Sequence, residues 1–178
     1  AVSECKRLTG EMAEHARDAI SNSIDVFNNY NADTVEYIRA QEALMDKYED
    51  KLGTYLVHLS NSELGETVSH QIARMLHSIG DFERMGDHAL NICQLAEEMH
   101  EKGIKFSDDA LKEISTVETA ITEIVNMTVD SFIKDDDELS SHIEPLEEVI
   151  DNLKKQLKAK HISRLQKGEC TIELGFIF

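Results

Sequence analysis

Apolar side chains recur every three or four residues along almost the whole chain, which is the spacing of an amphipathic helix. Short polar breaks rich in Asn, Asp, Gly and Ser divide this pattern into long blocks. The pattern therefore predicts five helices, at residues 2–29, 32–60, 63–102, 107–134 and 137–166. Residues suited to cap the starts of these helices are Asn31 and Asp33, Ser62, Ser107, and Asp135 to Asp137. Gly103 is expected to close the third helix.

Two short stretches can be interpreted in more than one way. Pro145 lies near the start of the fifth block, where it either kinks the helix or marks its true beginning. Residues 171–178 alternate in polarity and then become wholly apolar, a pattern that alone would suit a strand. An internal repeat favours a helix for this tail.

The repeat appears when the chain is laid against itself with an offset of 105 residues. Similar residues then coincide in six pairs: Phe27 with Phe132, Asp33 with Glu138, Glu42 with Glu147, Met45 with Ile150, Asp46 with Asp151, and Leu52 with Leu157. This match predicts an all-α protein built from a duplicated three-helix unit, at residues 1–104 and 105–178. The second copy contains only the opening of its third helix, because residues 175–178 coincide with 70–73.

Composition and charge narrow the class of protein. With 178 residues, 41% of them hydrophobic, the chain can bury a core, and no apolar run reaches the ~18–20 residues of a membrane span. The first residue, Ala1, already lies in a helical pattern, so we expect a piece of a longer protein. Three cysteines without CxxC spacing predict reduced thiols and a cytoplasmic location. A formal charge of −17 disfavours nucleic acid and anionic membrane surfaces and favours cations.

Paired carboxylates are the main candidates for chemistry. Each of three expected helices carries a Glu and an Asp four residues apart, beside its apolar stripe: Glu42 and Asp46, Glu83 and Asp87, and Glu147 and Asp151. Two such pairs facing each other would either bind a di- or trivalent cation or have raised pKa values. Because 35 of the 178 residues are acidic, such pairs also arise by chance on solvated faces. Their recurrence at matching repeat positions favours metal binding.

The third expected helix has further notable residues. Its buried stripe is expected to centre on Ile72, Ile79, Gly86, Leu90 and Cys93. A glycine in mid-helix is less favourable than alanine by about 1 kcal/mol, so Gly86 predicts a close contact between helices. Arg84 is interpreted as a surface ion pair with Glu83.

Signals for catalysis are weak. Glu97 and His100 have the spacing of a di-iron site, but the second copy that such a site needs is missing. Neither a phosphate-binding glycine loop nor a nucleophile motif is recognisable in the sequence. The sequence therefore indicates a protein that is not an enzyme.

The run from Asp81 to Ile92, DFERMGDHALNI, resembles the hallmark of the PhoU family of phosphate-uptake regulators. The resemblance implies tandem three-helix bundles whose acidic pairs hold metal: Glu42, Asp46, Glu83 and Asp87 in the first bundle, and Glu147 and Asp151 in the second. The metal would be iron, zinc, manganese or magnesium. The fourth pair would fall near positions 188 and 192, beyond Phe178.

Residues 168–178 are similar to the segment before the second hallmark in PhoU domains fused to sodium/phosphate cotransporters. This similarity implies a cytoplasmic domain that regulates inorganic phosphate transport, whose partner is the transporter's membrane domain or a signalling protein. The alternatives are a free-standing PhoU-type regulator and a metal-free helical adaptor. The incomplete second bundle would leave Ile143, Ile150 and Leu157 uncovered, which predicts a homodimer or helix exchange.

Overall fold

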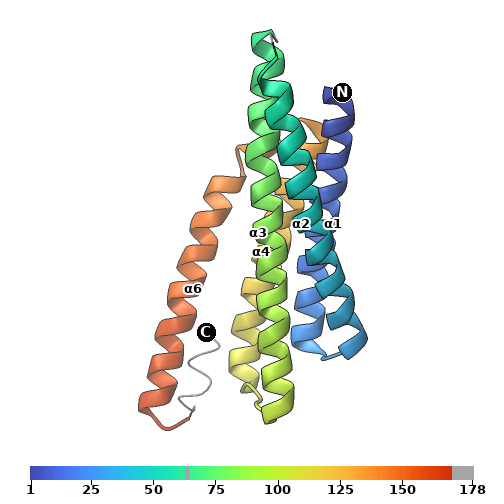
Figure 1. Cartoon of the computed structure of the whole chain (residues 1–178). Helices are drawn as coiled ribbons and strands as arrows, with labels where there is room; N and C mark the ends of the chain where they lie inside the picture. Colours follow the sequence, from blue (N-terminus) through green and yellow to red (C-terminus); the bar gives the residue numbers. More distant parts are fainter. Residues whose placement is uncertain (63–64, 170–178) are drawn as a thin grey trace. The chain divides into compact units, whose positions relative to one another are not determined.

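A computed structural model describes residues 1–62 and 65–169, and every regular element in these ranges is a helix (Figure 1). The helices are α1 (Val2–Asn28), α2 (Ala32–Ser60), α3 (Glu66–Lys102), α4 (Asp108–Lys134), α5 (Asp137–Ser140) and α6 (Ile143–Gln166). The all-α prediction is confirmed. The tail at 171–178 lies outside the described residues. Within the described ranges, no helix is both long and apolar enough to cross a bilayer.

Several predicted helix boundaries are correct because local side chains define them. The Asn31 side chain accepts a hydrogen bond from the Thr34 N–H at 3.0 Å, which caps α2. Ser107 caps α4 in the same way, through the Ala110 N–H at 3.3 Å. Gly103 follows the end of α3 with φ of +63°, a conformation that favours glycine.

The start of α3 differs from the prediction. Ser62 does not cap this helix, because α3 begins only at Glu66. The carbonyl of Gly65 opens the helix by accepting hydrogen bonds from the N–H groups of Val68 and Ser69. The helical period is continuous across this region of the sequence, so periodicity alone placed the start too early.

The fifth predicted helix is two helices, α5 and α6. Asp136 accepts a hydrogen bond from the Leu139 N–H at 2.9 Å at the start of α5, and the chain turns at Ser141 and His142. Pro145 is the third residue of α6. It therefore lies in the first turn, where the missing N–H removes no intrahelical bond, so it accompanies a helix start and not a kink.

The chain divides into two compact units, Ala1–Ala96 and Glu97–Phe178. The division falls within α3, whereas the repeat in the sequence predicts a boundary at residue 104. The first unit contains α1, α2 and most of α3, with α1 and α2 side by side (Figure 1). The second contains the end of α3 and helices α4, α5 and α6.

The core of the first unit depends on small residues in α1 and on an apolar stripe in each partner helix. Ala13, Ala16 and Ala19 are fully buried, so other side chains can approach the α1 backbone closely. Ile38 and Met45 of α2 are also fully buried. The α3 residues in this core are Ile72, Met75, Ile79, Phe82, Gly86, Ala89, Cys93 and Ala96.

In the second unit, α4 packs against α6. Glu113 of α4 joins the two helices through Arg164, at 3.1 Å, and Lys160, at 3.3 Å. The apolar side chains that recur at helical spacing in α6 are only half-buried: Leu146, Ile150, Leu153 and Leu157. Packing within this unit is therefore looser around α6 than around the helices of the first unit.

Candidate functional site

Helices α2 and α3 approach each other closely at the level of the first two acidic pairs. A Cβ atom added to Gly86 would lie 2.3 Å from Met45 Cε, 3.2 Å from Met45 Sδ and 3.9 Å from the Cα of Glu42. The predicted reason for a glycine here, close helix contact, is confirmed. Further along, a Cβ on Gly53 would meet Ile79 at 3.5 Å, so the two helices pack antiparallel.

The carboxylates of the two pairs interact across this contact. Burial raises the pKa of Glu42, and the negative charges of Asp46 and Asp87 raise it further. Burial likewise raises the pKa of Glu83, followed by the charges of Asp87, Glu49 and Asp46 and by a hydrogen bond with Asp87. The pKa of each glutamate is therefore raised in part by an acid on the opposite helix. The structure brings Glu42, Asp46, Glu83 and Asp87 together, as the repeat and the resemblance predict.

Glu49 is a fifth member of this group that sequence reasoning missed. Its Oε1 lies 3.7 Å from the position that a Cβ on Gly80 would occupy, which places it against α3. Two turns separate Glu49 from Glu42, so both lie on the same face of α2. The spacing of two turns from Glu42 is the sequence signal that could have identified Glu49. We call Glu42, Asp46, Glu49, Glu83 and Asp87 the carboxylate cluster.

The cluster lies at the edge of the core and not inside it. Glu42, Glu49 and Glu83 are half-buried, whereas Asp46 and Asp87 are exposed. The buried stripe of α3 includes Phe82 and Ala89, so its centre is rotated away from Glu83 relative to the prediction, and Leu90 is only half-buried. Solvent thus reaches one side of the cluster.

The cluster suits a cation in its charge and donor type, but its side chains are not yet arranged as ligands. Burial is the main cause of the raised pKa of Glu42 and Glu83, and repulsion among the carboxylates, which a di- or trivalent cation would relieve, raises both pKa values further. Within the part of the chain that the structure describes, no three His, Cys, Asp or Glu side chains form a ready metal site. Metal binding at the cluster is therefore a proposal, which is taken up below.

The third predicted pair has different surroundings. Glu147 and Asp151 are exposed on α6, and Asp151 lies 3.6 Å from Lys154 in a surface ion pair. Glu147 and Asp151 belong to the second unit, whereas the carboxylate cluster belongs to the first.

The ion pair predicted for Arg84 exists, but with another partner. The Arg84 guanidinium contacts Asp81 at 2.5 Å and not Glu83. Residues three apart are neighbours on a helix surface, whereas adjacent residues diverge. Glu83 is therefore left to interact with the other carboxylates.

Comparison with known proteins finds similarity to one family. Residues 9–96 match the PhoU domain. A phosphate-specific transport system accessory protein PhoU homolog 1 from Thermotoga maritima is 26% identical over 107 residues, which are 60% of this chain and 45% of that protein. These matches support the PhoU family. A PhoU homolog of the same description from Aquifex aeolicus is 27% identical over 165 residues, which are 87% of this chain and 69% of the relative.

The PhoU match coincides with the part of the chain that contains the cluster. It covers most of the first unit and includes the segment from Asp81 to Ile92, in which Phe82, Gly86 and Ala89 are buried. These buried residues hold Glu83 and Asp87 beside α2. The chain spans less than half the length of the Thermotoga relative, so the role of the complete protein is taken up as a proposal.

Proposed function

We propose that this chain is a PhoU-type domain that regulates inorganic phosphate transport and performs no catalysis itself. The observation that carries the proposal is the PhoU match over residues 9–96, together with relatives named as accessory proteins of phosphate-specific transport systems. Its partner would be the membrane domain of a phosphate transporter or a signalling protein. The site of action would be the cytoplasmic face of the membrane.

The second part of the proposal is that the carboxylate cluster binds a di- or trivalent cation. Glu42 and Glu83 would be ligands, helped by Asp46, Asp87 and Glu49. Carboxylate oxygens suit magnesium, manganese and iron better than zinc, which prefers nitrogen and sulfur donors. A bound cation would neutralise the repulsion between α2 and α3 and leave coordination positions for water or phosphate on the exposed side.

A paired-variant experiment tests the cation site. Elemental analysis should find metal in the purified wild-type protein and little in Glu83→Gln plus Asp87→Asn. The matched control is Glu147→Gln plus Asp151→Asn, which removes the same charges from an exposed pair beside Lys154 and should retain the metal. Equal metal content in all three proteins would refute the site.

The regulatory role needs a test in cells that carry the native gene. Introducing Glu83→Gln plus Asp87→Asn there should alter phosphate uptake when external phosphate changes, while the Glu147 and Asp151 control should behave as wild type. Unaltered uptake in the first strain, with normal protein levels, would contradict regulation through the cluster. Uptake that is altered equally in both strains would also count against it.

Two further features of the complete protein, its fusion partner and its oligomeric state, are also proposals. We propose fusion to a sodium-dependent phosphate symporter, and a free-standing PhoU regulator fits the same comparisons. The flanking coding sequence distinguishes the two. We further propose a homodimer that covers α6, whose Val149 and Ile162 side chains are 49% and 46% exposed. Light scattering that gives only a monomer would contradict it.

A further inference from the structure

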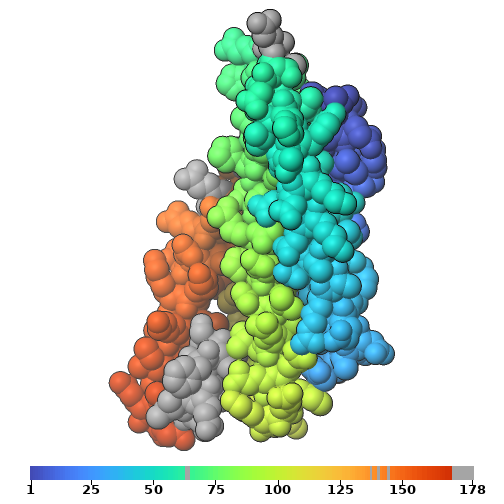
Figure 2. Space-filling view, in the orientation of Figure 1, coloured from blue at the N-terminus to red at the C-terminus, as the bar shows by residue number. Residues whose placement is uncertain are grey.

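A deep apolar groove opens between the beginning of α1 and the second half of α2, within the first unit. Its volume is about 680 Å³, in the range of ~300–1,000 Å³ that is typical of small-molecule sites. Cys5 and Leu52, which are nearly fully buried, lie at its floor, and Leu8 and Leu44 form its sides. Figure 2 shows the two helix segments that border it, α1 in dark blue and α2 in teal. The groove is distinct from the carboxylate cluster, which lies on the α3 side of α2.

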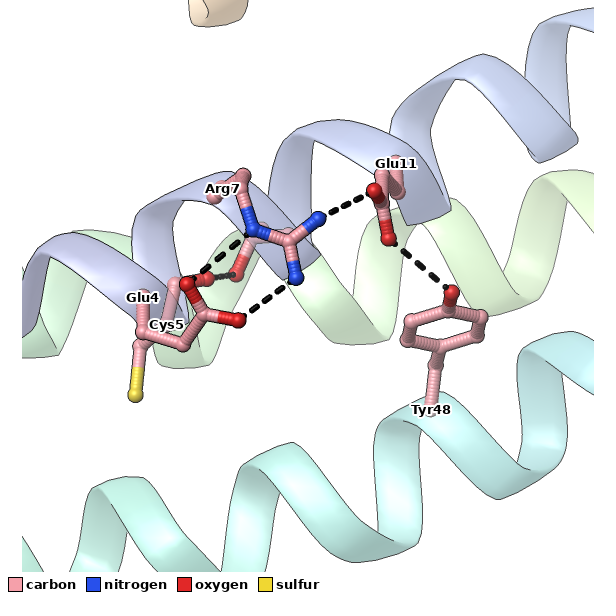
Figure 3. A network of polar contacts seen from close by, with 6 residues as sticks. Glu4, Cys5, Arg7, Glu11 and Tyr48 are labelled. Atoms are coloured by element: carbon pink, nitrogen blue, oxygen red, sulfur yellow. Dashed lines mark hydrogen bonds and ion pairs between the residues drawn. The ribbon is translucent and has the colours of Figure 1, made fainter. Parts of the chain in front are cut away.

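The floor of the groove is uncharged at neutral pH. Burial raises the pKa of the Cys5 thiol above its usual value, so the sulfur behaves as a small apolar group. Figure 3 shows the Cys5 side chain on the side of α1 that faces α2. An occupant would therefore contact sulfur and leucine side chains and need an apolar body.

Charge on the α1 edge of the groove is partly compensated by ion pairs within α1. Arg7 donates to Glu4 at 3.0 Å and is also paired with Glu11 (Figure 3). The Tyr48 hydroxyl of α2 donates to Glu11 at 3.3 Å across the gap. Arg7 therefore offsets one of the two negative charges, and Glu4, Arg7 and Glu11 together leave this edge with a net charge of −1.

The α2 edge carries positive charge that is not compensated in this way. Lys47 and Lys51 line the groove one helical turn apart, and neither forms an ion pair with another described residue. Both lysines are exposed and can therefore meet an anionic group at the mouth of the groove. Of the charged side chains that line the groove, Lys47 and Lys51 are positive and Glu4 is negative, so these side chains are net positive.

We propose that this groove binds a single-chain anionic amphiphile, such as a fatty acid, with its hydrocarbon chain between Leu8 and Leu44 and its acidic head at Lys47 and Lys51. Tyr55, which also lines the groove, is 48% exposed and can contact the chain near the mouth.

Titration calorimetry with laurate, dodecan-1-ol and acetate tests the proposal on the metal-free chain. Laurate should bind, dodecanol should bind at least fivefold more weakly, and acetate should not bind. Lys47→Gln plus Lys51→Gln should weaken laurate binding at least fivefold. The matched control, Lys155→Gln plus Lys158→Gln, removes two exposed lysines of α6 and should bind as wild type.

The location of the ligand can be checked without any variant. Amide chemical-shift changes on adding laurate to the wild-type protein should concentrate at residues 2–8 and 44–55. Shift changes elsewhere, equal binding of dodecanol, or no effect of the Lys47 and Lys51 substitutions would overturn the proposal. None of these outcomes depends on metal at the carboxylate cluster, so this site and the proposed function can fail separately.

Discussion

The contact between Gly86 and Met45 determines how closely α2 and α3 approach, and the substitution Gly86→Ala tests it directly. The added methyl group would lie 2.3 Å from Met45 Cε, well inside van der Waals contact. Met45 is fully buried, so its side chain has little room to move away. The overlap must be relieved by a changed Met45 rotamer or by separation of the helices.

The expected magnitude follows from two opposing effects. Forcing an extra methyl group into a packed core reduces the free energy of unfolding by about 1–3 kcal/mol. Replacing a mid-helix glycine with alanine increases it by about 1 kcal/mol. Gly86→Ala should therefore destabilise the protein by about 1 kcal/mol overall. In a Met45→Ala background the overlap is gone, and the same substitution should stabilise by about 1 kcal/mol.

Urea denaturation of the wild type, both single variants and the double variant completes the cycle. The predicted interaction energy is about 2 kcal/mol, with a change of sign for Gly86→Ala between the two backgrounds. Gly80→Ala is the control, because its Cβ would meet only Glu49 Oε1 at an ordinary 3.7 Å. That substitution should be stabilising whichever residue occupies position 45. Equal effects of Gly86→Ala in both backgrounds would refute the close contact.

Three further substitutions test the cluster, a cap and an interhelix bridge. Because burial and then Asp87 raise the pKa of Glu83 above 4.5, the folded state binds this proton more tightly than the unfolded state. With a chelator present, the free energy of unfolding of the wild type should fall as pH rises through this pKa. Glu83→Gln should therefore be about 0.5 kcal/mol more stable than the wild type at pH 7 and no more stable below pH 4.5. A difference in urea titrations that does not depend on pH would contradict this. Asn31→Ala removes the cap of α2 and should lower stability by about 1 kcal/mol in thermal unfolding, with Asn31→Asp close to wild type. Glu113→Gln removes the charged partner of Arg164, whose side chain is only 14% exposed. This substitution should lower the free energy of unfolding by about 2 kcal/mol. An unchanged urea midpoint would show that the bridge does not stabilise the fold.

Local sequence was sufficient to predict the helices, because their signals lie within a few residues of each boundary. Asn31, Ser107 and Gly103 act on the adjacent backbone, and the apolar period identifies each helix between them. Prediction was less successful where the local signal was ambiguous. Ser62 was predicted to cap a helix that in fact begins at Glu66. At Pro145 the sequence did not distinguish a kink from a helix start.

The sequence by itself determined the all-α class, most helix boundaries and the acidic pairs of α2 and α3, since all of these depend on the regular spacing of residues along one helix. Only the tertiary structure decided which side chains meet between helices. It brought Glu49 of α2 to Glu83 of α3 and left Glu147 and Asp151 of α6 exposed. The physical reason is that rotation of a helix about its axis is set by packing against its neighbours, as between Met45 and Gly86, and the helical period of a single segment does not specify it.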